Sequence, residues 1–147
     1  MPMFMGRDRE QIRQTYGRVW EKHQTGEVLE PLETIIAEVI HLHPEYHTLL
    51  QNLQDSLDKD WLPEGGETNP FLHMGLHIAI REQVSTNLPP GINEAYQNLL
   101  RSGTTVHDAE HQMMECLAES LWIAQRNGLP PNEQTYLESV RRLAGMR

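Results

Sequence analysis

Proline and glycine breakers divide this chain into segments whose apolar residues recur at three- and four-residue steps. Pro44, the proline-containing Leu88–Gly91 segment and Asn127–Gly128 interrupt that pattern most clearly. A proline inside a helix loses a hydrogen bond, and a glycine favours the backbone turn that follows a last helical turn. No segment shows the strict alternation of a half-buried strand. The sequence therefore predicts an all-α fold, a small irregular helical bundle of roughly five to seven helices.

The periodic segments set the expected helix boundaries and the sides expected to be buried. The spacing predicts helices over residues 8–23, 31–41, 44–55, 70–86, 93–101, 106–126 and 133–144. Residues 58–69 contain a proline and a glycine pair and are expected to form a loop. Leu32, Leu72 and Trp122 fall on stripes expected to face the core. We expect a single domain over residues 1–147, because neither half carries a sufficient core of its own.

The charge balance and the single cysteine limit the partners and the cellular compartment expected for the chain. Twelve Lys and Arg residues against 21 Asp and Glu residues give a formal net charge of −9. Nucleic acids and anionic membranes require a basic face, so neither is expected as a partner. The apolar runs fall far short of the ~20 residues of a membrane span, and the first residues lack a signal-peptide pattern. Cys116 alone forms no intrachain disulfide and fits a reducing compartment, so a cytoplasmic location is expected.

Histidine is unusually frequent, with eight in 147 residues, and seven of the eight fall into close groups. The groups are His41, His43 and His47, then His73 and His77, then His107 and His111. Residues four apart on a helix lie about 5–6 Å apart at Cβ, so two such imidazoles can chelate one ion. At roughly 100° per residue, His73 and His77 lie on or beside the apolar stripe of their helix. This placement points both rings toward the protein interior.

The later histidine helix adds carboxylates on the same side, because Glu110 and Glu115 also face or flank its expected interior. Burying so many ionisable groups costs stability unless they are paired or coordinate a metal. Nitrogen and oxygen donors without thiolate suit zinc, iron(II), nickel or manganese. We therefore predict a divalent metal ion, zinc or iron, as a cofactor. Its expected ligands are His73, His77, His107, His111 and Glu115, with His47 approaching from the 44–55 helix. Glu110 is expected to orient a ligand imidazole, and this many ligands leaves open one ion or a dinuclear site.

Two other interpretations of the same histidines stay open. In the first, they form a metal-free buried polar network, and the protein is a helical interaction module. In the second, the protein is a small hydrolase, because residues 107–111 match the H-x-x-E-H signature with Glu110 as base for a metal-activated water. That match is short, and only 147 − 111 = 36 residues follow His111. A homodimer is compatible with every interpretation, and the sequence specifies no small-molecule substrate.

Two further features are expected to have structural roles, and a third is a candidate for a functional contact. Glu38 and His41 match half of a di-iron carboxylate pattern, but both face away from the apolar stripe of residues 31–41. Cys116 is expected on an outer face, as a packed or surface thiol rather than a nucleophile. Trp61 lies in the long loop and is a candidate for a contact surface or a lid.

Several runs of residues carry a family resemblance over nearly the whole chain. They are His43–His47, Asn69–His73 with His77 and Arg81–Gln83, Glu110–His111 with Met114–Leu117, and Leu121–Trp122 followed by Ala124–Gly128. On these runs the chain resembles a bacterial family of similar length that is catalogued as a domain of unknown function. The resemblance implies a small helical cytoplasmic protein and brings no established activity or ligand with it.

Overall fold

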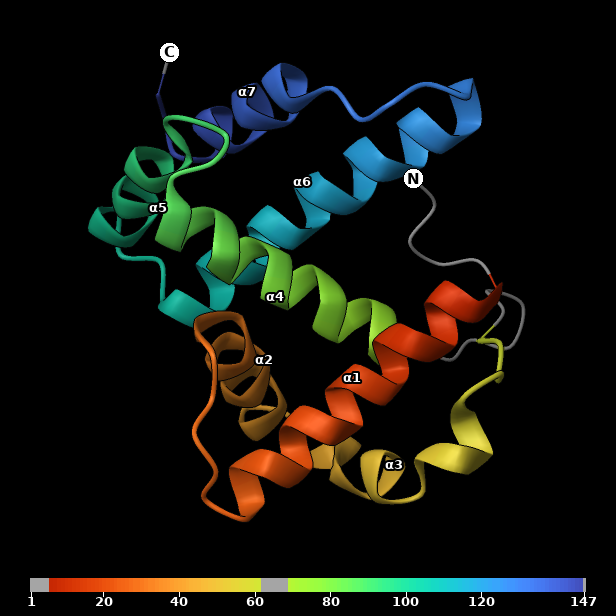
Figure 1. Ribbon diagram of the computed structural model, residues 1–147. Coiled ribbons are helices and arrows are strands. Elements are labelled where there is room, and N and C mark those ends of the chain that lie inside the picture. The colour runs from red at the N-terminus through yellow and green to blue at the C-terminus, as the bar shows by residue number, and fades with distance from the viewer. Residues whose placement is uncertain (1–5, 62–68, 147) are drawn as a thin grey trace. The chain divides into compact units, whose positions relative to one another are not determined.

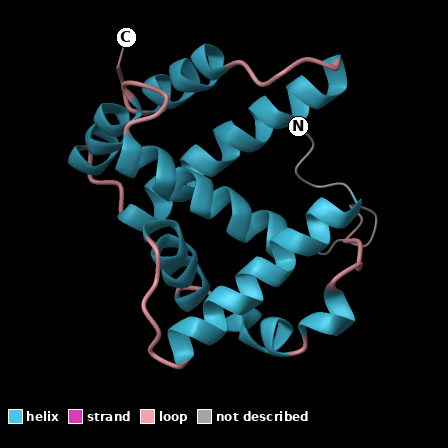
Figure 2. Cartoon of the chain, in the orientation of Figure 1, coloured by secondary structure: helices cyan, strands magenta, loops and turns pink. Residues whose placement is uncertain are grey.

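A computed structural model describes residues 6–61 and 69–146 of the chain. Within these ranges lie α1 (Gly6–Gln24), α2 (Pro31–His41), α3 (His47–Gln51), α4 (Pro70–Thr86), α5 (Ile92–Arg101), α6 (Val106–Asn127) and α7 (Glu133–Leu143) (Figure 1). Two 3-10 helices, η1 (Pro44–Tyr46) and η2 (Leu53–Ser56), flank α3. Neither described range contains a strand, so the predicted all-α fold is confirmed (Figure 2).

The helix boundaries follow the start and stop signals closely. The Thr105 hydroxyl accepts a hydrogen bond from the backbone N–H of Asp108 at 3.1 Å, which caps the start of α6. Gly128 ends that helix in the left-handed region, at φ 66°. The one helix expected over residues 44–55 is instead η1, α3 and η2 in succession. It breaks because Asn52 adopts a non-helical backbone, at φ −111° and ψ 41°.

The chain divides into two compact units, and the division falls inside α4 between Gly75 and Leu76. The first unit contains α1, α2, α3 and the start of α4, and the second contains the rest of α4 with α5, α6 and α7. A single domain over residues 1–147 stays a prediction. Across the described ranges, no helix combines the length and apolarity that crossing a membrane would need.

In the first unit, α1 packs against α2 through apolar side chains at helical spacing. Val19 and Trp20 from α1 are buried, as are Val39 and Ile40 from α2. The expectation that Leu32 joins this stripe is wrong, because its side chain is 46% exposed. Leu32 follows the first residue of α2, and burial begins only one turn later along that helix.

Arg13 is a buried cation that holds two parts of the first unit together. It is only 2% exposed, and its Nη1 donates to the carbonyl oxygens of Ser56, Leu57 and Lys59 at 2.8, 3.0 and 2.9 Å. Its guanidinium also lies 4.6 Å from the centre of the Phe71 ring. These contacts engage carbonyl groups at the last residue of η2 and just beyond it, and they fix that segment against α1.

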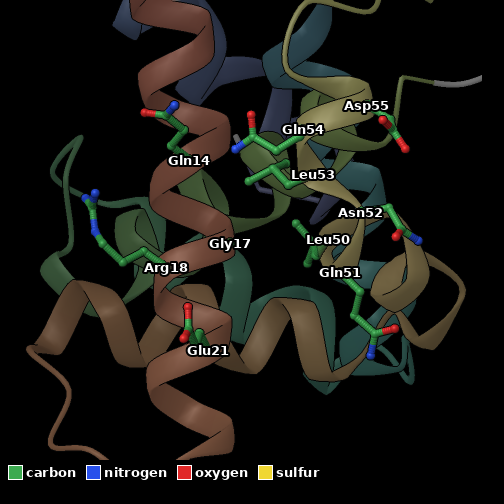
Figure 3. Close-up of a pocket in the computed structure, with 10 residues that line it drawn as sticks. All are labelled: Gln14, Gly17, Arg18, Glu21, Leu50, Gln51, Asn52, Leu53, Gln54 and Asp55. Atoms are coloured by element: carbon green, nitrogen blue, oxygen red, sulfur yellow. The ribbon is translucent and has the colours of Figure 1, made fainter.

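A groove open to solvent runs along α1, α3 and η2, with a volume of about 560 Å³ (Figure 3). At its edge α1 approaches η2 so closely that a Cβ atom on Gly17 would lie 2.6 Å from Cδ2 of Leu53. Its lining is mostly amide and charged side chains, among them Gln14, Arg18 and Gln54. The histidines singled out in the sequence lie outside this groove.

The second unit has a core built from the inner faces of α4, α5, α6 and α7. Ala109, Met113 and Met114 supply the inner stripe of α6, which leaves Trp122 outside. Trp122 is 58% exposed beside Arg126, so the expectation that it is a core residue is wrong. Cys116 is half-buried and packs against the core rather than lying on an outer face, which also corrects the expectation.

The buried stripe expected for α4 is wrong at its first residue, Leu72, whereas Leu76, Ile80 and Val84 pack in or against the core as expected. Leu72 is 41% exposed, whereas Phe71, Met74 and Ile78 are buried. The Phe71 ring stacks on Tyr16 in the first unit, with ring centres 6.4 Å apart. The larger aromatic side chain therefore takes the interior position, and Leu72 is left on the outer side.

Candidate functional site

His43 is placed by the end of α2. It follows the C-cap residue Leu42 and is 5% exposed. Its Nδ1 lies 2.7 Å from the carbonyl oxygen of Val39, which can only accept, so Nδ1 carries the proton and donates. In the neutral imidazole, this hydrogen bond leaves Nε2 of His43 as the nitrogen with the lone pair.

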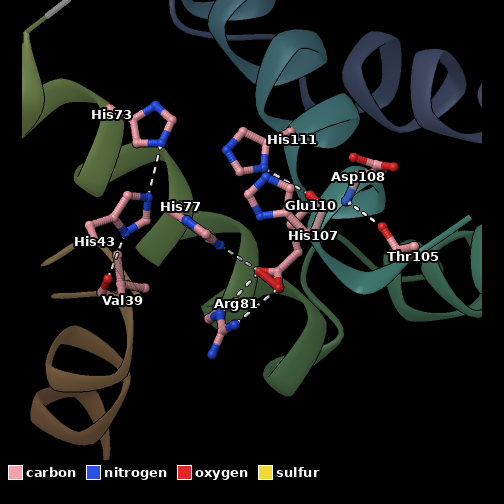
Figure 4. A network of polar contacts seen from close by, with 10 residues as sticks. All are labelled: Val39, His43, His73, His77, Arg81, Thr105, His107, Asp108, Glu110 and His111. Carbon is pink, nitrogen blue, oxygen red and sulfur yellow. Dashed lines mark hydrogen bonds and ion pairs between the residues drawn. The ribbon is translucent and has the colours of Figure 1, made fainter. Parts of the chain in front are cut away.

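The Nε2 atom of His43 faces the Nε2 atom of His73 at 3.2 Å (Figure 4). Tyr46 from η1 covers this pair: its ring stacks on the His43 ring, with centres 5.4 Å apart. The same tyrosine ring meets His73 edge-on at 6.3 Å. The first unit therefore holds two imidazole nitrogens close together beneath an aromatic ring.

The start of α4 sets the position of His73. The Asn69 side-chain oxygen accepts hydrogen bonds from the backbone N–H groups of Phe71 and Leu72, at 3.0 and 3.2 Å. This cap, followed by Pro70 in the first turn, fixes where the helix begins. His73 and His77 consequently lie one turn apart on the same side of an uninterrupted helix.

In the second unit, His77 lies against a buried ion pair. It is 1% exposed, and its Nε2 donates to Oε2 of Glu110 at 2.8 Å. Arg81, one turn further along α4, donates from Nε to the same oxygen at 3.0 Å and from Nη2 to Oε1 at 3.2 Å (Figure 4). Both carboxylate oxygens of Glu110 are therefore engaged.

Glu110 is ionised despite its burial. Burial alone raises the pKa of this carboxyl, but the hydrogen bonds from His77 and Arg81 outweigh it and hold the pKa below its ordinary value. The Glu110–Arg81 pair is consequently close to neutral, and the carboxylate orients the His77 ring. This contact is the one expected for Glu110 from the sequence.

His43, His73 and His77 form the group with metal-binding potential among the residues that the structure describes. Each offers one ring nitrogen, and these nitrogens lie within 4.8 Å of one another. Two of the three stand one turn apart on the continuous helix α4, and the third contacts the first of them. Neutral imidazole is a common ligand of zinc, iron, nickel and copper, so three such donors suit a divalent transition metal.

The other ligands expected from the sequence lie outside this group. His47 donates from Nε2 to the carbonyl oxygen of Ile40, 2.9 Å away, and packs on Trp20 with ring centres 4.5 Å apart. His107 and Glu115 are exposed, because the inner stripe of α6 does not pass through them. The expectation that they face the interior is wrong.

His111 occupies an intermediate position in the second unit. Its ring centre lies 5.4 Å from that of His77 and 4.1 Å from that of His107. Its Nδ1 approaches the carbonyl oxygen of His107 at 2.8 Å. His111 is thus a ring neighbour of His77 without being part of the three-histidine group.

His43 is the residue that the sequence argument did not place in the site, although a signal was present. It continues the three- and four-residue steps of the buried Ile36, Val39 and Ile40. Pro44 conceals this, because the proline marks the end of the helix and suggests that the stripe stops before it. The exposed Glu38 and His41 lie on the other side of α2, as expected.

The surroundings of Glu110 and Cys116 bear on two alternative chemistries, metal-assisted hydrolysis and attack by a thiol nucleophile. In the hydrolase interpretation Glu110 acts as base for a water, but both of its oxygens are held by His77 and Arg81. Cys116 is no activated nucleophile either, because burial and the nearby Glu119 and Glu115 raise the pKa of its thiol. The hydrogen bonds of Glu110 and the raised pKa of Cys116 therefore give no support to acid–base or nucleophilic chemistry by these two groups.

Comparisons with known proteins complete the description of the site. Searches of curated proteins and of solved structures each gave no match. One family model matches residues 8–142, which include all three histidines of the group together with Arg81 and Glu110. The chain therefore belongs to the family described as "Domain of unknown function (DUF1841)".

Proposed function

We propose that this protein binds one divalent transition metal ion, Zn²⁺ or Fe²⁺, through His43, His73 and His77. The observation that carries the proposal is the placement of their ring nitrogens within 4.8 Å of one another. The His43 and His73 Nε2 atoms lie 3.2 Å apart. Two nitrogens bound to one tetrahedral zinc at about 2.0–2.1 Å would lie about 3.3 Å apart. The pair thus has nearly the spacing that a shared ion requires.

The hydrogen bonds around the three rings also favour coordination. A metal-binding imidazole typically donates its other N–H to a carbonyl or carboxylate, which fixes the ring and makes it a better donor. His43 donates from Nδ1 to the Val39 carbonyl, so Nε2 is its ligand atom. His77 donates from Nε2 to Glu110, so Nδ1 is its ligand atom. Two of the three rings are held in this way before an ion arrives.

A metal-free polar network is the second candidate, and one observation favours it. A separation of 3.2 Å between the two Nε2 atoms also fits an N–H···N hydrogen bond from His73 to His43. In that case a proton occupies the place that the metal would take. The two candidates predict opposite results for metal uptake by the full chain.

The deciding experiment is elemental analysis of the untagged full-length chain, stripped with chelator and then reconstituted with Zn²⁺. We expect about one equivalent per chain. His73→Ala is the test variant, because its half-buried side chain is removed with the least disturbance of the core. Loss of a residue that only hydrogen-bonds to a metal ligand lowers metal affinity about 10–100-fold. Loss of His73, a proposed ligand itself, should lower the Zn²⁺ affinity by more than that.

His41→Ala is the matched control, since His41 is exposed on the last turn of α2 and lies outside the group. Its zinc stoichiometry and affinity should equal those of the wild type, and circular dichroism should show both variants folded. Zinc uptake that survives in His73→Ala, or a wild-type chain that takes up none, would overturn the proposal in favour of the metal-free network.

The cellular setting proposed with this function rests on composition. The net charge of −9 disfavours nucleic acid and anionic membranes as partners, and the single cysteine suits a reducing, cytoplasmic compartment.

A further inference from the structure

The second half of α6 continues past the core of its own unit. Among the described residues of this helix, those that pack in or against the core cluster end with Leu117, although α6 continues to Asn127. Further along, three large apolar side chains are exposed within eight residues: Trp122 at 58%, Ile123 at 38% and Leu129 at 65%. Such a concentration of exposed apolar side chains is typical of a surface that contacts another protein.

Two opposite charges lie on the same side of α6 as Trp122. Glu119 and Arg126 are both exposed, and the Arg126 guanidinium lies 4.8 Å from the centre of the Trp122 ring. At about 100° and 1.5 Å per residue, Glu119 lies about 60° around the helix and about 4.5 Å before Trp122. Arg126 lies about 40° around the helix in the same sense and about 6 Å beyond Trp122. Trp122 therefore stands between an acid and a base on one face.

This arrangement is complementary to a second copy of itself. In a dimer with a two-fold axis beside Trp122, antiparallel helices bring residues before Trp122 in one copy to residues after it in the other. Glu119 then lies opposite Arg126 of the partner subunit, about 1.5 Å away along the helix axes, and the symmetry produces this pair twice. Parallel helices would instead bring equal residues to equal heights, so Glu119 would not reach Arg126 of the partner subunit.

The overall charge of the chain shows why a contact of this kind is needed for self-association. With a formal net charge of −9 per chain, two copies repel each other. Association therefore requires a local contact in which opposite charges meet. Tryptophan and arginine are also the residue types that most often dominate the binding energy of protein interfaces.

We propose that the chain forms a homodimer by antiparallel pairing of two α6 helices about Trp122, with Glu119 of each copy paired to Arg126 of the partner subunit. The dimer is independent of the metal ion, since none of the three proposed ligands lies on α6. Three turns of one helix present much less than the about 800 Å² per partner of a stable interface. The dimer is therefore weak, with a Kd on the order of 10–100 μM.

Sedimentation equilibrium of the untagged full-length chain, from about 1 μM to about 1 mM, tests for this dimer. Chelator and a thiol reductant are present, which excludes association through a metal ion or through Cys116. We expect monomer at the lowest concentrations and dimer at the highest. A chain that stays monomeric throughout would overturn the dimer proposal and leave the metal proposal intact.

An exchange of the two charges tests the pairing itself. Arg126→Glu places like charges opposite each other at both ends of the contact, so the Kd should rise by about tenfold or more. Adding Glu119→Arg restores two pairs of opposite charge with the net charge of the wild type, and the dimer should return. Arg101→Glu is the matched control, because Arg101 is exposed in the last turn of α5 and undergoes the same change of charge.

The outcomes of these variants separate the specific pair from general repulsion. A double variant that dimerises as poorly as Arg126→Glu would overturn the antiparallel pairing, and so would an equal loss of dimer in Arg101→Glu. Trp122→Ser should abolish the dimer while circular dichroism at low concentration shows a folded monomer. A dimer that survives Trp122→Ser unchanged would place the interface elsewhere and overturn the proposal.

Discussion

Replacing Glu110 with glutamine tests the buried network without any metal. Glu110 is 3% exposed and accepts hydrogen bonds from His77 at 2.8 Å and from Arg81 at 3.0 and 3.2 Å. Glutamine keeps the shape but removes the charge and turns one acceptor into a donor that faces N–H groups. The guanidinium of Arg81 then loses the carboxylate that it contacts at 3.0 and 3.2 Å.

The structure allows the size of this effect to be worked out. Removing one partner of a buried ion pair costs about 3–5 kcal/mol of unfolding free energy. Glutamine still offers one carbonyl oxygen, so we expect the lower end, about 3 kcal/mol. With a urea m-value of about 2 kcal/mol/M, the unfolding midpoint should fall by about 1.5 M.

The effect should also depend on pH in a defined direction. The pKa of Glu110 is held below its ordinary value of 4.5, so the ionised form is favoured in the folded chain. Its contribution is therefore complete above the ordinary value and is lost as the pH falls through the lowered folded pKa. The difference between the wild type and Glu110→Gln should be full at neutral pH and shrink in acid below about pH 4.

Urea unfolding followed by circular dichroism, with chelator present, measures this difference. Glu82→Gln is the matched control on α4, because Glu82 is exposed and its removal should change stability by less than about 0.5 kcal/mol. A Glu110→Gln penalty below about 1 kcal/mol, or one that is unchanged in acid, would refute the reasoning from charge pairing.

Three further outcomes follow from other parts of the molecule. Arg13→Met should lower the unfolding free energy by about 3–5 kcal/mol, because three carbonyl groups lose their charged donor, and a loss below 1 kcal/mol in denaturant titration would contradict this. Cys116 should react with a disulfide reagent at pH 8 many times more slowly in the folded chain than after unfolding, since burial raises the pKa of its thiol; equal rates would show that it is accessible and ionised. Trp122→Ser should change the unfolding free energy by no more than about 0.5 kcal/mol, because the side chain is 58% exposed. A larger loss in thermal unfolding would show that Trp122 packs as a core residue.

Helix positions were predictable from the sequence because the signals that start and end helices are local. Pro31, the Thr105 cap and Gly128 each act within a turn, and the boundaries of α2 and α6 follow them. The inner faces were less predictable, since spacing shows which residues share a side but not which side is covered. Leu72 and Trp122 illustrate this, because partners distant in sequence decide their exposure.

The candidate site was half predictable for the same reason. His73 and His77 share the buried side of one helix, so local spacing identified them. His43 joins them only because the chain beyond α2 turns back toward the start of α4, which no local pattern specifies. Arg13 was missed because a charge normally indicates an exposed position, and only the carbonyl groups at the last residue of η2 and just beyond it explain its burial.

The hydrogen bond from His43 to Val39 would make the affinity for the proposed metal ion depend on the backbone of α2. The acceptor is a main-chain carbonyl, so a change of the Val39 side chain leaves it in place. Only fraying of the last turns of α2 would release the ring. By linkage, a bound ion would oppose that fraying by the same free energy by which fraying weakens ion binding. Glycine at the exposed Glu38, which lies outside the three-histidine group, should therefore weaken binding of the proposed ion, and the loaded protein should protect the amides at the end of α2 from hydrogen exchange.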